Sequence, residues 1–148
     1  MKLRSQRLII GDYVFNFLNE VEINSTWKNL CDTGIVKLPR RYNSVMVGKK
    51  VQTLDKILKA GDKVEIWLGY DWDLKLRFKG YLKSFKPNYP IELEVEDEMY
   101  MWKRTKVTPK AFRGGDVASI LSHIGVKNYV IFGSKMTVGD FLISNEMN

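Results

Sequence analysis

One stretch decides the fold class: residues 63–80, with the sequence KVEIWLGYDWDLKLRFKG. Apolar and polar side chains alternate on both sides of a turn at residues 71–73, as they do in two antiparallel strands. One face of this predicted hairpin is apolar and carries Val64, Ile66, Leu68, Leu74, Leu76 and Phe78. The other face carries Glu65, Trp67, Lys75, Arg77 and Lys79. The pattern predicts strands that turn one face to a core and the other face away from it.

The alternation extends to both sides of the hairpin. Further strands are predicted at residues 6–10, 13–24, 34–38, 81–85, 91–96, 128–132 and 136–143. The strand at 13–24 should carry an irregularity at 17–19, where the alternation slips. Residues 40–50 are expected to form a loop, and residues 54–59 a short helix or turn.

One longer helix is predicted near the end of the chain. Asp116 can cap its start, and Gly125 can end it. Its apolar stripe is formed by Val117, Ile120, Leu121 and Ile124. The elements together predict a mainly β fold, a small antiparallel β-barrel or sandwich over residues 1–104, with a short α/β addition over 105–148.

Composition narrows the functional classes. The 148 residues suit one medium domain, alone or with a small appendage. The single cysteine, Cys31, excludes an internal disulfide and a site built on several cysteines.

No apolar run approaches the roughly 20 residues of a membrane-spanning helix, and the N-terminus does not match a signal peptide. The net charge of +7 suggests nucleic acid, but the cations are scattered, with only pairs at 40–41 and 49–50.

An acidic stretch at residues 90–104, PIELEVEDEMYMWKR, is the first candidate for chemistry. Glu92, Glu94 and Glu96 project from one side of a strand, where alternate residues lie about 7 Å apart. Two carboxylates at that separation cannot share Mg²⁺ or Ca²⁺ without a ligand from elsewhere. We expect a solvated face balanced by lysines such as Lys83, and not a metal or acid–base centre. Residues 99–102 should form an aromatic plug at one end of the barrel.

The only histidine, His123, lies within the predicted helix. A metal site that needs two or three histidines is therefore impossible within one chain. No nucleophile-elbow motif accompanies this histidine, so a surface or helix-end position is expected. The residues predict no catalytic, cofactor-binding or metal-binding site, and the chain is not expected to be an enzyme.

Six pieces of sequence, taken in order, resemble one known family. They are residues 22–25 with 27–33 (EINS, WKNLCDT), 36–40 (VKLPR), 59–64 (KAGDKV), 68–71 (LGYD), 78–81 (FKGY) and 94–100 (EVEDEMY). Over roughly residues 13–104 the chain resembles the baseplate-hub or late-control family of phage tail proteins, which has relatives in contractile injection machines.

The resemblance implies a split, tail-tube-like β-barrel that serves as a structural subunit of a ring, commonly a trimeric hub. It also implies other tail and baseplate proteins as partners, a place in the virion tail after synthesis in the bacterial cytoplasm, and no catalytic residue in this barrel. Hub proteins are usually much longer. The resemblance therefore implies either the N-terminal part of a hub or a shortened prophage relative, and we expect 105–148 to be an extension or the start of a second hub domain.

The outward face of the hairpin is the candidate protein interface. If Ile66 pairs with Phe78 and Leu68 with Leu76, then Trp67 lies opposite Arg77 and Glu65 opposite Lys79. Tyr70 and Trp72 adjoin at the turn. This composition favours a contact with a neighbouring subunit anchored by Trp67.

Two alternatives stand beside that interface. In the first, the helix after Gly115 folds back over Trp67 within the same chain. In the second, the chain is a small β-barrel that binds nucleic acid through interleaved Trp, Tyr and Lys side chains.

Overall fold

The computed structural model describes residues 2–47, 49–87, 89–133 and 136–144. The chain divides into two compact units, Met1–Arg104 and Thr105–Asn148.

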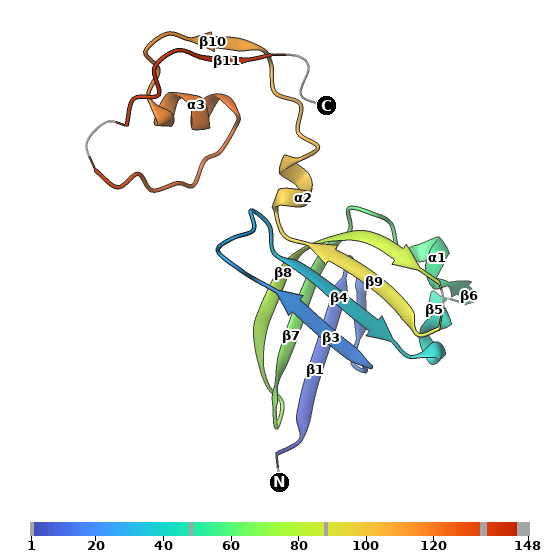
Figure 1. Cartoon of the computed structure of the whole chain (residues 1–148). Helices are drawn as coiled ribbons and strands as arrows, with labels where there is room; N and C mark the ends of the chain where they lie inside the picture. Colours follow the sequence, from blue (N-terminus) through green and yellow to red (C-terminus); the bar gives the residue numbers. More distant parts are fainter. Residues whose placement is uncertain (1, 48, 88, 134–135, 145–148) are drawn as a thin grey trace. The chain divides into compact units, whose positions relative to one another are not determined.

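The first unit is a seven-stranded antiparallel sheet, ordered β2-β1-β7-β8-β9-β4-β3 (Figure 1). Its strands are β1 (Arg4–Ile10), β2 (Tyr13–Phe15), β3 (Glu20–Asn24), β4 (Thr33–Leu38), β7 (Lys63–Tyr70), β8 (Asp73–Lys86) and β9 (Ile91–Glu96). The mainly β, antiparallel prediction is confirmed. The sheet is open, because its two edge strands, β2 and β3, do not pair with each other.

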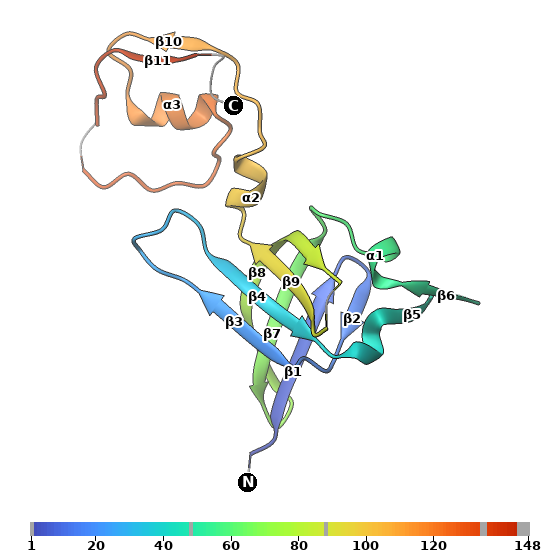
Figure 2. The same ribbon diagram turned by 45° about the vertical axis from the view of Figure 1, so that its right-hand side comes forward.

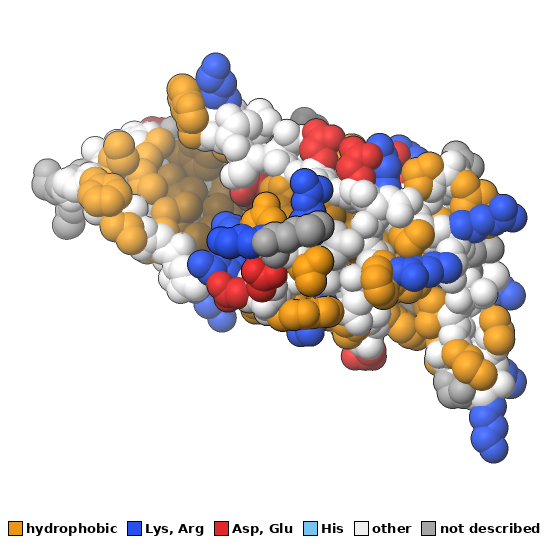
Figure 3. All heavy atoms as spheres, turned by 90° about the horizontal axis from the view of Figure 1, so that it is seen from below, with side chains coloured by type: hydrophobic (Ala, Val, Ile, Leu, Met, Phe, Trp, Pro, Cys, Tyr) orange, Lys and Arg blue, Asp and Glu red, His pale blue; other side chains and the backbone are white. Residues whose placement is uncertain are grey.

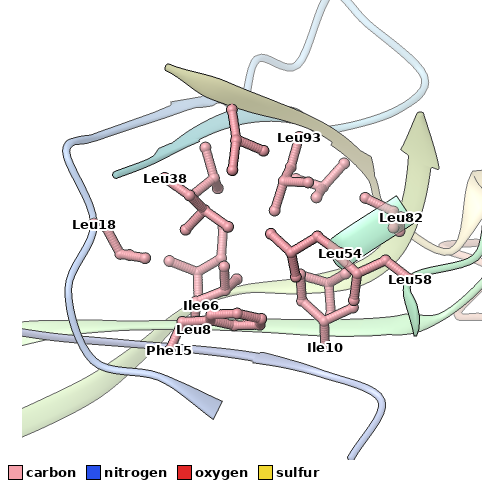
Figure 4. Close-up of a cluster of buried hydrophobic side chains, with 14 of the residues drawn as sticks. Leu8, Ile10, Phe15, Leu18, Leu38, Leu54, Leu58, Ile66, Leu82 and Leu93 are labelled. Atoms are coloured by element: carbon pink, nitrogen blue, oxygen red, sulfur yellow. The ribbon is translucent and has the colours of Figure 1, made fainter. Parts of the chain in front are cut away.

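The strands curl around one hydrophobic core. Side chains of β1 and β7, such as Leu8 and Ile66, point toward Leu38 and Leu93 of the opposite strands (Figure 4). Leu54, at the start of the short helix α1 (Leu54–Ile57), is fully buried among them. Period-two alternation thus places one apolar row of each strand in a shared interior, which supplies most of the stability of such a unit.

The predicted strand at 13–24 is two strands, which is a correction. β2 pairs with β1 and β3 pairs with β4, so they lie at opposite edges of the sheet. The slip in alternation at 17–19 marks the crossing between them, where Leu18 is buried and Phe17 is exposed. The Leu18 carbonyl accepts a hydrogen bond from Gln6 Nε2 at 2.9 Å, which satisfies a backbone group that has no ladder partner.

The predicted loop at 40–50 is also wrong. It contains the 3₁₀ turn η1 (Arg40–Asn43) and the first strand of a hairpin formed by β5 (Ser44–Val47) and β6 (Lys50–Thr53). Figure 2 shows this hairpin projecting beside the large sheet. Two four-residue strands give too short a pattern for alternation to identify them.

The hairpin at 63–80 forms, but its register shifts halfway. Ile66 pairs with Phe78 and Glu65 with Lys79, as predicted. A bulge then follows, so that Trp67 faces Leu76 and Leu68 faces Lys75. The predicted pairs of Leu68 with Leu76 and of Trp67 with Arg77 are therefore wrong.

The length of the turn explains this shift. Asp71 and Trp72 have positive φ angles, 49° and 67°, and form a two-residue turn that pairs Tyr70 with Asp73. Between the pair Ile66–Phe78 and the turn, β7 has four residues (67–70) and β8 has five (73–77). One residue of β8 therefore has no partner and forms a bulge. The N-terminal segment holds this turn: Leu3 N donates to Asp71 Oδ1 and Trp72 N donates to Ser5 Oγ.

The second unit contains β10 (Lys110–Phe112), α3 (Val117–His123) and β11 (Phe141–Ile143). Asp116 caps α3 by accepting a hydrogen bond from Ser119 N at 2.8 Å, as predicted. Residues 128–132 form no strand, and the strand predicted at 136–143 is confined to β11. β11 pairs with β10, a strand that the sequence did not indicate.

Candidate protein interface

The structure separates the four predicted interface residues into two groups. Trp67 is half-buried, and its Nε1 donates to Glu65 Oε2 at 3.1 Å. Arg77 is exposed within the bulge and does not lie opposite Trp67. Tyr70 and Trp72, at the tip of the hairpin, are 54% and 76% exposed. The tip therefore presents two aromatic rings to solvent, whereas Trp67 is held in the sheet surface.

More prominent apolar groups lie in the connection between β3 and β4. Trp27 is 91% exposed and Leu30 is 89% exposed. The base of this connection is fixed, because Ser25 Oγ donates to Asp32 Oδ2 at 2.9 Å and Asp32 N donates to Asp97 Oδ2 at 2.8 Å. An ordered loop that presents a Trp and a Leu loses little conformational entropy on binding. Sequence reasoning missed this pair, although large apolar residues inside a polar turn were the available signal.

The β5–β6 hairpin is a second projecting element. Met46 and Val51 form a cross-strand pair on one of its faces, and both are largely exposed. The surrounding segment, residues 39–59, holds six Lys or Arg residues and a single acid, Asp55. At its base, the Arg41 guanidinium lies 3.9 Å from the ring centroid of Phe17. This arrangement combines apolar contact area with a strong positive charge.

The predicted acidic face is partly neutralised by a neighbouring strand. Lys86 Nζ contacts Glu92 Oε1 at 2.8 Å and Glu94 Oε1 at 2.6 Å. Its hydrogen bond lowers the pKa of Glu94, and the two carboxylates raise the pKa of Lys86. Both glutamates are half-buried, so the predicted solvated face is only partly correct. These carboxylates form ion pairs across the sheet.

The prediction that Glu96 lies on a solvated face is wrong, because its side chain is buried. Lys103, just after the helical turn α2 (Met99–Trp102), forms an ion pair with it, and Lys83 Nζ lies 4.0 Å away. Burial alone would raise the pKa of Glu96, but the hydrogen bond and charge of Lys103 outweigh it, so the pKa is lowered. Sequence reasoning placed Glu96 on the strand face correctly but could not place the lysine that covers it.

The aromatic plug predicted at 99–102 is only partly buried: Tyr100 is buried, whereas Met99 and Trp102 are half-buried. Tyr100 is buried, stacks on Tyr81 at a centroid distance of 5.9 Å, and receives the Arg104 guanidinium 3.7 Å from its ring centroid. Met101 is 47% exposed. Tyr100 is therefore the one fully buried side chain of this turn.

His123 lies at the end of α3, as predicted. Its Nε2 is 2.8 Å from the Thr108 carbonyl oxygen, and its ring packs edge-on against Phe112. Across residues 2–47, 49–87, 89–133 and 136–144, no three His, Cys, Asp or Glu side chains gather as a metal site would require. The histidine contacts are those of a structural side chain.

One face of the molecule shows hydrophobic side chains intermixed with Lys and Arg, and carboxylates in small groups between them (Figure 3). The centre of a protein interface is depleted of charged residues. The exposed Trp27, Leu30 and Trp72 are therefore better candidate anchors than this mixed face.

Comparison with known proteins gives no relative: no family model and no curated protein matches the chain. Among the described helices, none has the length and apolar character needed to cross a bilayer.

Proposed function

We propose that this chain is a structural subunit of a phage or prophage tail baseplate hub, and that it assembles into a ring through protein–protein contacts. The observation that carries the proposal is the first unit itself: an open, curled antiparallel sheet with ordered tips that present Trp27, Leu30 and Trp72 to solvent. In this proposal the sheet is a split, tail-tube-like barrel. The opening lies between β2 and β3.

The sequence resemblance supports the same role. Its six pieces lie along the first unit from β3 to α2, and they include most of the β3–β4 connection and the end of β7. Two of these segments carry an exposed aromatic residue, Trp27 in the first and Tyr70 in the second. A trimeric ring is the state that the resemblance implies.

The surface also fits a protein partner. Exposed aromatic side chains held on ordered loops are the usual anchors of protein interfaces. The side chains that were weighed as catalytic groups have structural contacts. Glu92, Glu94 and Glu96 form ion pairs with lysines, and His123 contacts a backbone carbonyl. These contacts favour a structural role over an enzymatic one.

The proposal is tested by the mass of the purified protein in solution, with electron microscopy of the assembled species. A closed oligomer with a central opening supports it. The genomic neighbourhood is an independent test, because tail-tube, tape-measure and spike genes should lie beside the gene. A monomer at all concentrations, encoded among unrelated genes, would overturn the proposal.

A further inference from the structure

The β5–β6 hairpin has the features of an element that awaits a partner strand. It is a separate two-stranded sheet that packs on the core through Val45 but leaves Met46 and Val51 exposed. Each of its strands has an edge that pairs with no other strand in the described part of the chain. Lys49 and Lys50 lie at its tip, where they precede the exposed Val51.

The large sheet offers a complementary edge at β3. This strand pairs with β4 on one side and ends the strand order on the other. Its outward side chains, Glu20 and Glu22, are exposed, whereas Val21 and Ile23 are half-buried against the core. β3 itself carries two Glu residues and no Lys or Arg, and Glu20 Oε2 contacts Lys37 Nζ of the neighbouring strand β4 at 2.8 Å.

Charge determines which strand this edge can accept. A second β3 edge would bring like carboxylates together, and directly opposed like charges are destabilising. A strand that begins with Lys50 brings the opposite charge. Exposed edge strands are templates for pairing with another chain, and edge charges select the partner.

The two strands also match face by face. Residues that lie opposite each other in a sheet share a face, so alternate residues of the incoming strand follow the alternation of β3. If Lys50 and Gln52 share the outward face with Glu20 and Glu22, then Val51 falls on the inner face. There it meets the side of the sheet that carries Val21 and Ile23.

We propose that the hairpin of one copy adds its β6 strand to the β3 edge of a second copy. The contact joins two different surfaces of the same chain, so it is head-to-tail and closes into a ring if the rotation between copies permits. This inference rests on the proposed function and names the surfaces through which the ring forms. Backbone hydrogen bonds supply affinity, and the Lys–Glu match supplies direction.

The test is a charge-reversal exchange measured by sedimentation velocity. Lys50→Glu and Glu22→Lys should each weaken self-association roughly tenfold, because each places like charges at the contact. The double variant should regain most of the wild-type association. Lys63→Glu and Asp12→Lys are matched charge-reversal controls. Both positions are exposed and lie outside the β5–β6 hairpin and β3, so these variants should leave the association unchanged.

A second measurement does not depend on variants. Backbone amide exchange should slow at residues 20–24 and 50–53 in the oligomer relative to the diluted monomer. Self-association that persists in both single variants, without slowed exchange on β3, overturns this inference and leaves the proposed function standing. A wild-type protein that remains monomeric overturns both. If Lys50→Glu loses DNA binding but self-associates normally, the β5–β6 hairpin binds nucleic acid. That result would also overturn the proposed strand addition.

Discussion

The buried carboxylate of Glu96 is paired with the ammonium group of Lys103, which follows one helical turn after the strand. The pairing lowers the pKa of Glu96 against the opposing effect of burial and raises the pKa of Lys103. It links β9 to α2 at the boundary of the first unit. A buried charge of this kind is stable only while its partner is present.

The stability that this pair contributes should therefore be present at neutral pH and lost at acid pH. A carboxyl group with a lowered folded pKa contributes stability fully above its ordinary value of 4.5, and that contribution is lost as the pH falls through the lower folded value. Glu96→Gln should lower the free energy of unfolding by about 1–3 kcal/mol at neutral pH. Thermal melts from neutral to acid pH should show the difference from wild type shrinking.

Glu94→Gln is the matched control. The Glu94 side chain is 30% exposed and contacts Lys86, itself about half-exposed, so the change should be about 1 kcal/mol or less. An effect of Glu94→Gln as large as that of Glu96→Gln would contradict the assignment of the buried pair. Stoichiometric metal binding that Glu94→Gln abolishes would instead show that the acidic face is a metal site.

The core should respond to truncation at the helix α1. Leu54 is fully buried between the two sides of the sheet, so Leu54→Ala should cost about 2–5 kcal/mol. Leu30→Ala removes the same atoms from an exposed loop and should change stability by about 0.5 kcal/mol or less. Chemical denaturation of both variants checks the pair. Equal stability of the two variants would mean that the core is not where the structure places it.

The sequence predicted what depends on local alternation. Ile66 pairs with Phe78 because an apolar row must face the core. The bulge beyond that pair could not be predicted, because it follows from a two-residue turn held by Leu3 and Ser5 in a distant segment. Glu96 shows the same limit at the candidate site. Its place on the strand was predictable, but its pairing with Lys103 beyond the end of the strand was not.

The two candidate aromatic anchors should behave differently. Trp67 is half-buried and hydrogen-bonded to Glu65, so Trp67→Ala should lower stability by about 1–3 kcal/mol. Trp72 is mostly exposed, so Trp72→Ala should leave the melting temperature nearly unchanged and weaken self-association. Melting curves and light scattering separate the effects. Unchanged association in Trp72→Ala would exclude the hairpin tip from the interface.

Binding to DNA should be weak and unspecific, despite the net charge of +7. The cations of residues 39–59 lie beside exposed apolar groups, and carboxylates occupy much of β3 and β9. Any affinity should fall steeply with salt, because it arises from phosphate contacts alone. Fluorescence anisotropy with labelled oligonucleotides over a salt series checks this. Tight binding near physiological salt would favour the nucleic-acid-binding alternative.

Assembly into a ring of identical subunits is tested by sedimentation velocity over a wide range of protein concentration. We expect a concentration-dependent shift from monomer to one limiting, closed species, which the family resemblance implies to be a trimer. The shift should be weakened by high salt, because charge pairs help to direct the contact. A single monomeric boundary at every protein and salt concentration would show that the chain does not form a ring.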